Sequence, residues 1–130
     1  MSSEYLGYTE KVLEHFRNPH NMGKLDDADG IGKAGSSMCG DIMWIYIRVE
    51  NNTIVDCKFE TVGCAAAIAS SSVLTDFVKG KTIEEAQKIS NKDVIAQLGG
   101  LPPIKVHCSV LAEDGIKAAI EDYLKKSHKL

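Results

Sequence analysis

Residues 43–60, MWIYIRVENNTIVDCKFE, alternate apolar and polar side chains on both sides of a central Asn51-Asn52 pair. An alternation with a period of two is typical of strands that bury one face, and the asparagine pair suits a tight turn between them. The stretch therefore predicts an antiparallel hairpin. Its buried face would carry Met43, Ile45, Ile47, Val49, Val55, Cys57 and Phe59, and its outer face Trp44, Tyr46, Arg48, Glu50, Asp56, Lys58 and Glu60.

Helical patterns lie on both sides of this hairpin. Helices are expected over about residues 9–18, 65–80, 82–89, a short stretch before Gly99 and 109–126, with a short strand near residues 31–34. Gly115 should weaken the last helix by about 1 kcal/mol relative to Ala. The prediction is an α+β fold in which a small antiparallel sheet of about three strands packs against helices, the last helix being long.

Length and composition predict a single domain over residues 1–130. A hydrophobic fraction of 44% can form a core, and no run approaches the roughly 18 apolar residues that a membrane span needs. The N-terminal segment lacks the apolar stretch of a secretory signal and the Arg-rich, acid-poor character of a transit peptide, which favours a cytoplasmic location or a matured organellar one. The formal charge of -3 argues against nucleic acid as a partner.

Three cysteines stand at junctions between loops and expected elements: Cys39 in SSMCGD, Cys64 in TVGCAAA and Cys108 in KVHCSV. None of them has the Cys-x-x-Cys spacing of zinc knuckles, and in a reducing compartment disulfides are not expected. Asp41 and His107 stand beside them. Because thiolates select soft centres, the pattern predicts one iron-sulfur or zinc site gathered from three loops.

The surroundings of these residues predict thiolate chemistry. Cys64 and Cys108 each come immediately before an expected helix, whose free N–H groups favour the thiolate over the thiol. Asp41 follows Cys39 by two residues, so one junction could supply a sulfur and an oxygen. His107 could be the fourth ligand instead, or exchange a proton with Cys108. The residues alone leave the choice between Asp41 and His107 open.

Three segments closely resemble the IscU/NifU-N family of iron-sulfur cluster assembly scaffolds: SMCGD at 37–41, VGCAAAIASSS at 62–72 and LPPIKVHCSVLAEDGIKAAI at 101–120. The similarity covers nearly the whole chain, including YTEKVLEHFRNPHNMG near its start. The chain departs from the common family pattern at Ala65-Ala66, where Gly-Ser is usual, and at Gly115, where Ala is usual. A single unit without the insertion of SufU proteins favours the stand-alone IscU type.

The resemblance implies that Cys39, Cys64 and Cys108 hold a nascent [2Fe-2S] cluster, with Asp41 close by and His107 as a competing ligand. Zinc would occupy the same ligands in the cluster-free form. The chain would be a scaffold rather than an enzyme: it would accept persulfide sulfur and pass the finished cluster to recipient apoproteins. Cys108 is the first candidate for the sulfur acceptor, because the loop expected before it could carry it toward the donor, and Cys64 is the second.

The resemblance also implies partners. The sulfur donor would be a cysteine desulfurase of the IscS/NifS type, and a ferredoxin or frataxin-like protein would take part in assembly. The LPPIK segment resembles the motif by which IscU proteins bind a specialised heat-shock chaperone and its co-chaperone; it consists of Leu101, Pro102, Pro103, Ile104 and Lys105. Two consecutive prolines predict an extended, exposed backbone for it.

Two other functions use the same residues. The three cysteines with Asp41 or His107 could form a structural or regulatory zinc site. Alternatively, Cys108 and His107 could form a nucleophile–base pair for thiol chemistry. Against this enzyme hypothesis, neighbouring side chains in a strand or loop usually point apart, and the sequence reveals no third group to orient them.

Overall fold

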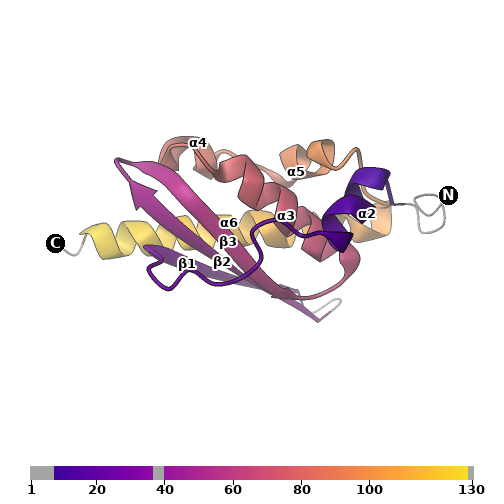
Figure 1. Cartoon of the computed structure of the whole chain (residues 1–130), viewed down its shortest axis with the longest axis horizontal. Helices are drawn as coiled ribbons and strands as arrows, with labels where there is room; N and C mark the ends of the chain where they lie inside the picture. Colours follow the sequence, from indigo (N-terminus) through magenta and orange to yellow (C-terminus); the bar gives the residue numbers. More distant parts are fainter. Residues whose placement is uncertain (1–7, 37–39, 129–130) are drawn as a thin grey trace.

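The hairpin and the short strand form a three-stranded antiparallel sheet in the order β1-β2-β3 (Figure 1). The computed structural model describes residues 8–36 and 40–128. The strands are β1 (Gly30–Ser36), β2 (Asp41–Glu50) and β3 (Thr53–Val62). Asn51 and Asn52 join β2 to β3 with φ values of 52° and 63°, the left-handed conformation that Asn tolerates and a two-residue hairpin turn requires. The predicted hairpin is confirmed.

One bulge changes which side chain of β3 enters the core. Arg48 pairs with Asp56, but Val49 pairs with Ile54, so the register shifts by one residue. Ile54 is fully buried and Val55 is 41% exposed. The prediction that Val55 faces the core is wrong, because a bulge adds a residue that a strict period of two cannot locate.

The helices appear in the expected order. They are α2 (Glu10–Arg17), α3 (Ala65–Val78), α4 (Ile83–Gln87), α5 (Asn91–Gln97), the 3-10 turn η1 (Pro103–Lys105) and α6 (Val106–His128). The side chain of Thr9 accepts a hydrogen bond from the Val12 N–H at the start of α2. Thr82 and Glu85 form the predicted capping box of α4. Among the described residues, no helix is long and apolar enough to cross a membrane.

The last helix begins earlier than predicted. The chain is extended at Pro102 (φ -56°, ψ 141°), but Pro103 opens η1, which continues directly into α6. The extended conformation predicted for LPPIK is therefore wrong beyond Pro102, because a proline in a first helical turn has a suitable φ and loses no hydrogen bond. Cys108 consequently lies in the first turn of α6 and not before the helix. Ile104 is 77% exposed, in keeping with the predicted exposure of this segment.

α6 runs along one face of the sheet and crosses β1 at very close range (Figure 1). A Cβ atom added to Gly32 would lie 2.2 Å from the Gly115 carbonyl oxygen and 2.3 Å from the Ala119 nitrogen. A Cβ added to Gly115 would lie 2.7 Å from Cγ1 of Ile45. The weaker helix propensity of Gly115 is thus offset by a contact between helix and strand that a larger residue would prevent.

The segment between α2 and β1 crosses the opposite face of the sheet. Gly23 donates its N–H to the Phe59 carbonyl on β3, and Asp27 pairs with Arg48 on β2 at 3.4 Å before the chain enters β1. This segment covers part of that face. Tyr46 is also on the predicted outer face, where its hydroxyl donates to Glu60, and its exposure is only 7%.

Candidate metal centre

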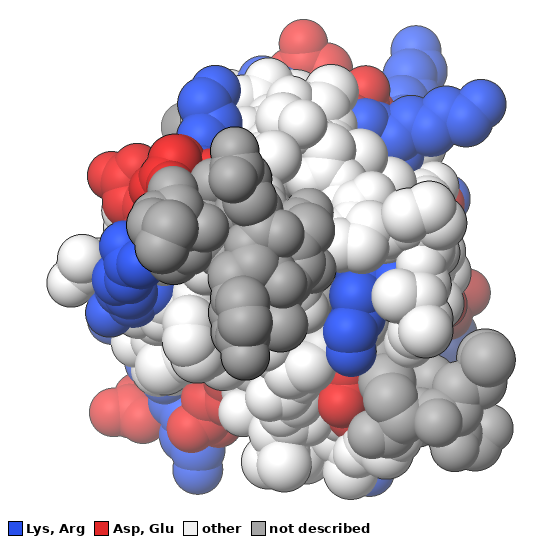
Figure 2. Space-filling model, turned by 90° about the vertical axis from the view of Figure 1, so that its right-hand side faces the viewer, with Lys and Arg blue, Asp and Glu red and all other residues white. Residues whose placement is uncertain are grey.

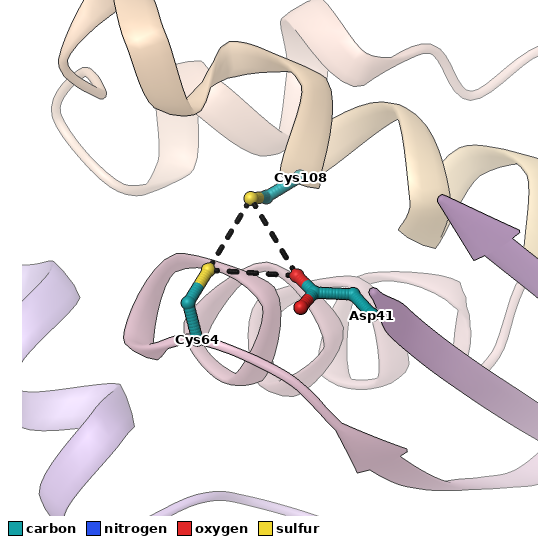
Figure 3. Close-up of side chains that lie close together, drawn as sticks. All are labelled: Asp41, Cys64 and Cys108. Carbon is teal, nitrogen blue, oxygen red and sulfur yellow. Dashed lines mark hydrogen bonds between the residues drawn. The ribbon is translucent and has the colours of Figure 1, made fainter. Parts of the chain in front are cut away.

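Three elements bring three chemically active side chains together at one end of the sheet. Asp41 is the first residue of β2, Cys64 is the N-cap of α3 and Cys108 lies in the first turn of α6. Figure 3 shows their side chains converging. The Cys64 and Cys108 sulfurs are 3.3 Å apart, and Asp41 Oδ2 lies 3.6 Å from the former and 3.9 Å from the latter. All three ligand atoms lie within 4.8 Å of one another.

The local backbone conformation orients Asp41 and Cys64. Gly40 has a φ of 71°, a left-handed conformation that glycine adopts without strain and that turns the chain into β2 at Asp41. Cys64 has an extended backbone (φ -80°, ψ 174°) and is followed at once by α3. The free N–H groups at the start of a helix favour negative charge, so this junction suits the binding of an anionic group.

The three groups differ in their access to solvent. Asp41 is 4% exposed and Cys108 is fully buried, whereas Cys64 is half-buried. The Cys64 thiol donates to Asp41 Oδ2. Burying a carboxylate is costly unless donors or a cation compensate its charge, and a metal ion between these three groups would supply such compensation. Cys64 gives the site an opening to solvent.

His107 stands beside this group. Its Nε2 atom lies 3.7 Å from the Cys108 sulfur, although it does not belong to the compact group of three. The expectation that these neighbouring side chains point apart is wrong, because successive side chains in a helical turn diverge by about 100° and not by the 180° of a strand. The choice between Asp41 and His107 as a ligand stays a prediction.

The two other cysteines of the chain are Cys39 and Cys57. Cys39 lies outside the described residues, and its predicted role as a ligand stays untested. Cys57 is fully buried in β3, and burial raises the pKa of its thiol. The prediction that Cys57 belongs to the core is confirmed.

Sequence reasoning missed Tyr8, which lies near the two thiols. Tyr8 is 6% exposed, and burial raises its pKa; the positive charge of Lys105 opposes this shift, while Cys64 and Cys108 add to it. No periodic pattern marked Tyr8, because it precedes the first helix. The only signal for it was its place in the N-terminal segment that matches the family.

The end of the molecule that carries the start of α6 is weakly charged. Figure 2 shows this end: outside the grey atoms, uncharged side chains cover most of its middle, and Lys, Arg, Asp and Glu gather mainly toward the edge. Two exposed apolar side chains flank the site in the sequence, Val62 at 67% before Cys64 and Ile104 at 77% before Cys108.

Comparison with known proteins identifies the family. Residues 7–130 match the family described as the NifU-like N terminal domain. The chain belongs to this family. It is 56% identical over 123 residues to the iron-sulfur cluster assembly scaffold protein IscU 1 of Archaeoglobus fulgidus, covering 95% of this chain and 80% of that protein. It is 54% identical over 126 residues to the iron-sulfur cluster assembly enzyme IscU of Drosophila melanogaster, covering 94% and 81%.

A solved structure has the same fold. It is the putative iron-sulfur cluster assembly scaffold protein for the SUF system from Fervidobacterium islandicum, with a TM-score of 0.72 at 25% identity, covering 87% of this chain and 96% of that one. The predicted α+β fold and the resemblance to IscU/NifU-N proteins are both confirmed.

Proposed function

We propose that this member of the NifU-like N-terminal family is a scaffold on which a [2Fe-2S] cluster is assembled from desulfurase-derived sulfur and iron and then transferred to apoproteins. The observation that carries the proposal is the convergence of Asp41, Cys64 and Cys108 from three separate elements. The iron-sulfur assembly names of its relatives support it. The cluster is the cargo of the protein and not a resident cofactor.

The spacing of the three groups suits a bound metal ion. A tetrahedral ion bound by two thiolates at about 2.3 Å holds their sulfurs about 3.8 Å apart. The two sulfurs lie 3.3 Å apart and would have to separate by about 0.5 Å. The sulfur–oxygen separations of 3.6 and 3.9 Å are already wide enough for iron or zinc between them. Cys39 is proposed as a further ligand, with His107 as the competitor of Asp41. The same atoms would bind Zn²⁺ in the cluster-free form.

The mixture of ligands favours release over permanent storage. Carboxylates suit harder cations than thiolates do, so Asp41 would hold iron less firmly than a fourth cysteine. The half-buried Cys64 leaves one side of the site open to exchange. A closed site with four cysteines would have neither property.

Sulfur delivery is proposed to occur by thiol–persulfide exchange with a cysteine desulfurase. A thiolate of this chain attacks the outer sulfur of the desulfurase persulfide, the new persulfide forms here and the desulfurase thiolate leaves. Cys108 is the first candidate and Cys64 the second. Because Cys108 is fully buried, its reaction would require the first turn of α6 to move. A ferredoxin or frataxin-like protein would assist reduction and iron entry.

The proposal also includes a chaperone partner and a cellular location. The exposed Ile104 and Pro103 of the LPPIK segment lie directly before the cysteine-bearing turn, which suits a chaperone and co-chaperone that act on cluster release. A cytoplasmic location is proposed because the site needs reduced thiols.

Anaerobic reconstitution tests the proposal. The purified chain is incubated with ferrous iron, cysteine and a cysteine desulfurase, and visible absorbance and circular dichroism are recorded. The wild type should develop a [2Fe-2S] spectrum, Cys64→Ala and Cys108→Ala should not, and the matched control Cys57→Ala should. A chain that binds zinc but develops no chromophore would contradict the scaffold function and support a zinc protein.

Mass spectrometry of the same reaction tests the enzyme alternative. Mapping persulfide cysteine by cysteine should find at most one sulfur transfer per scaffold chain in the absence of iron and reductant. Multiple turnovers that persist in a chain lacking Cys39 would instead favour a Cys108–His107 enzyme.

A further inference from the structure

Gly63, between β3 and α3, faces the carboxylate of Asp41. A Cβ atom added to Gly63 would lie 3.0 Å from Asp41 Cγ and 3.2 Å from Asp41 Oδ2. Oδ2 is the oxygen to which the Cys64 thiol donates. The backbone of Gly63 is not left-handed, so its conformation does not require glycine. Glycine is needed at this position because the Asp41 carboxylate occupies the space in which a side chain would lie.

The surroundings allow few ways to make room for a methyl group at this position. The same added Cβ would lie 3.1 Å from the Ala67 Cβ, and Ala67 is fully buried on α3. The methyl would therefore be held between α3 and the carboxylate. Contacts of 3.0–3.2 Å are tighter than ordinary van der Waals contact, so the neighbours must give by a few tenths of an ångström. Ala67 is part of α3, and the Asp41 side chain is the neighbour that can rotate. A shift of that size is at least as large as the tolerance of metal–ligand distances, about 0.2 Å.

We infer that Gly63 is a positioning residue: it leaves the space in which the Asp41 carboxylate lies against both thiols as a metal ligand. This inference rests on the proposed function, because it assumes that Asp41 binds metal there. It adds a residue that is not itself a ligand and that affects metal binding through Asp41.

Gly35 provides a matched control. It also lies next to Asp41, since β1 pairs with β2 at this end, and like Gly63 it is exposed. A Cβ added to Gly35 would meet only the Asp41 backbone oxygen, at an ordinary 3.6 Å. Gly35→Ala therefore adds the same methyl beside the same residue without touching its carboxylate.

The test is an anaerobic titration with Co²⁺ alone, which reports thiolate and oxygen ligands through its charge-transfer and ligand-field bands. Affinity is measured by competition with a chelator. Gly63→Ala should bind Co²⁺ about tenfold more weakly than wild type, the loss typical of disturbing a ligand's support, and its ligand-field bands should move toward those of Asp41→Ala. Gly35→Ala should match wild type. Asp41→Ala/Gly63→Ala should bind like Asp41→Ala, because the two changes act through one group.

Three results would overturn the inference: wild-type affinity in Gly63→Ala, additive losses in the double variant, or no Co²⁺ bound through thiolates in the wild type. Thermal unfolding without metal checks that the variants fold. If Gly63→Ala does not fold, Gly63→Ala/Ala67→Gly supplies the comparison: with the Ala67 methyl removed, the added methyl can move toward α3, and affinity should return toward wild type. Continued loss there counts against the inference. Failure of the scaffold function would look different, as normal Co²⁺ binding without a cluster chromophore.

Discussion

Cys57 and Cys108 are equally inaccessible to solvent, yet their thiols have different polar neighbours. Both are fully buried and belong to the hydrophobic core. Cys57 sits in the middle of β3, where burial raises its pKa. Cys108 lies at the start of α6, with the Cys64 sulfur, Asp41 Oδ2 and His107 Nε2 all within 4 Å.

The difference shows that burial alone does not separate a core cysteine from a candidate ligand. What separates them is the number of polar groups within reach. In the middle of a strand neighbouring side chains alternate between faces, and among the described residues no second metal-ligating group converges on the Cys57 thiol as Asp41 and Cys64 do on Cys108. At the ends of elements the chain changes direction, and three such ends can meet.

Labelling rates should give the largest contrast. In the metal-free protein, iodoacetamide should react with the half-buried Cys64 at least about 10³-fold faster than with Cys57, because exposing Cys57 requires opening the core at a cost near the global stability. The raised pKa of Cys57 acts in the same direction. Time-resolved mass spectrometry of peptides measures both rates. Similar labelling rates at Cys64 and Cys57 would contradict the difference in accessibility between the two thiols.

Removal of single thiols should give the next largest effect. Cys64→Ala and Cys108→Ala should each weaken Zn²⁺ binding by about a hundredfold or more, since each ligand supplies a large share of the binding free energy of thiolate sites. Cys57→Ala should leave Zn²⁺ affinity unchanged and lower the free energy of unfolding by about 1–2 kcal/mol. Chelator competition and denaturant unfolding separate the two outcomes. Weaker zinc binding in Cys57→Ala would contradict the assignment of Cys57 to the core rather than to the metal site.

Alkaline pH should affect stability through Cys57. Burial keeps its thiol protonated in the folded chain, whereas the unfolded chain releases that proton near pH 8.5, the ordinary pKa being about 8.5. Its contribution to stability is thus fully present below that pH. Above it the folded state binds one more proton, and the free energy of unfolding falls by about 1.4 kcal/mol per pH unit until the folded thiol ionises. Denaturant unfolding measured from about pH 8 to about pH 10 should give Cys57→Ala a flatter decline than wild type. Equal slopes would contradict this.

The smallest expected effect concerns cluster lifetime. Asp41→Ala makes the surroundings of Cys108 more like those of Cys57, and it removes the weakest proposed ligand. We expect a bound cluster to persist about three- to tenfold longer, a difference of about 1 kcal/mol in the barrier to loss. Visible absorbance under anaerobic conditions measures the decay. Asp122→Ala, which removes a carboxylate bound to the Ile31 N–H far along α6, serves as control; equal or faster loss in Asp41→Ala would contradict the assignment.

Much of the fold followed from local patterns. The hairpin was predictable because alternation and an Asn-Asn turn agree with each other, and the capping box marked the start of α4. Val55 could not be placed correctly, because its position depends on a bulge. Tyr46 lies on the predicted outer face, where its hydroxyl donates to Glu60, but its burial could not be predicted from the strand pattern.

The candidate site was predictable in composition but not in geometry. The positions of Cys64 and Cys108 at junctions, together with the resemblance, brought the correct groups into one hypothesis. Their actual contacts depend on where α6 begins, and the two prolines concealed that point because both extended and helical backbones accept them. The sequence did not indicate that Asp41 and not His107 belongs to the compact group of ligand atoms. It also did not indicate the space beside Gly63.

The glycines at the crossing of α6 and β1 bring the long helix closest to the sheet at one point. Seven residues separate this crossing from Cys108, a length of about 10 Å along the helix. If α6 tilted as a rigid body, this crossing would be its pivot. A tilt of about 5° at the pivot would swing the Cys108 sulfur by about 1 Å, as much as a change of metal–ligand contact requires. A partner that binds the C-terminal end of α6, far from the described cysteines, could in this way weaken the binding of metal at the site.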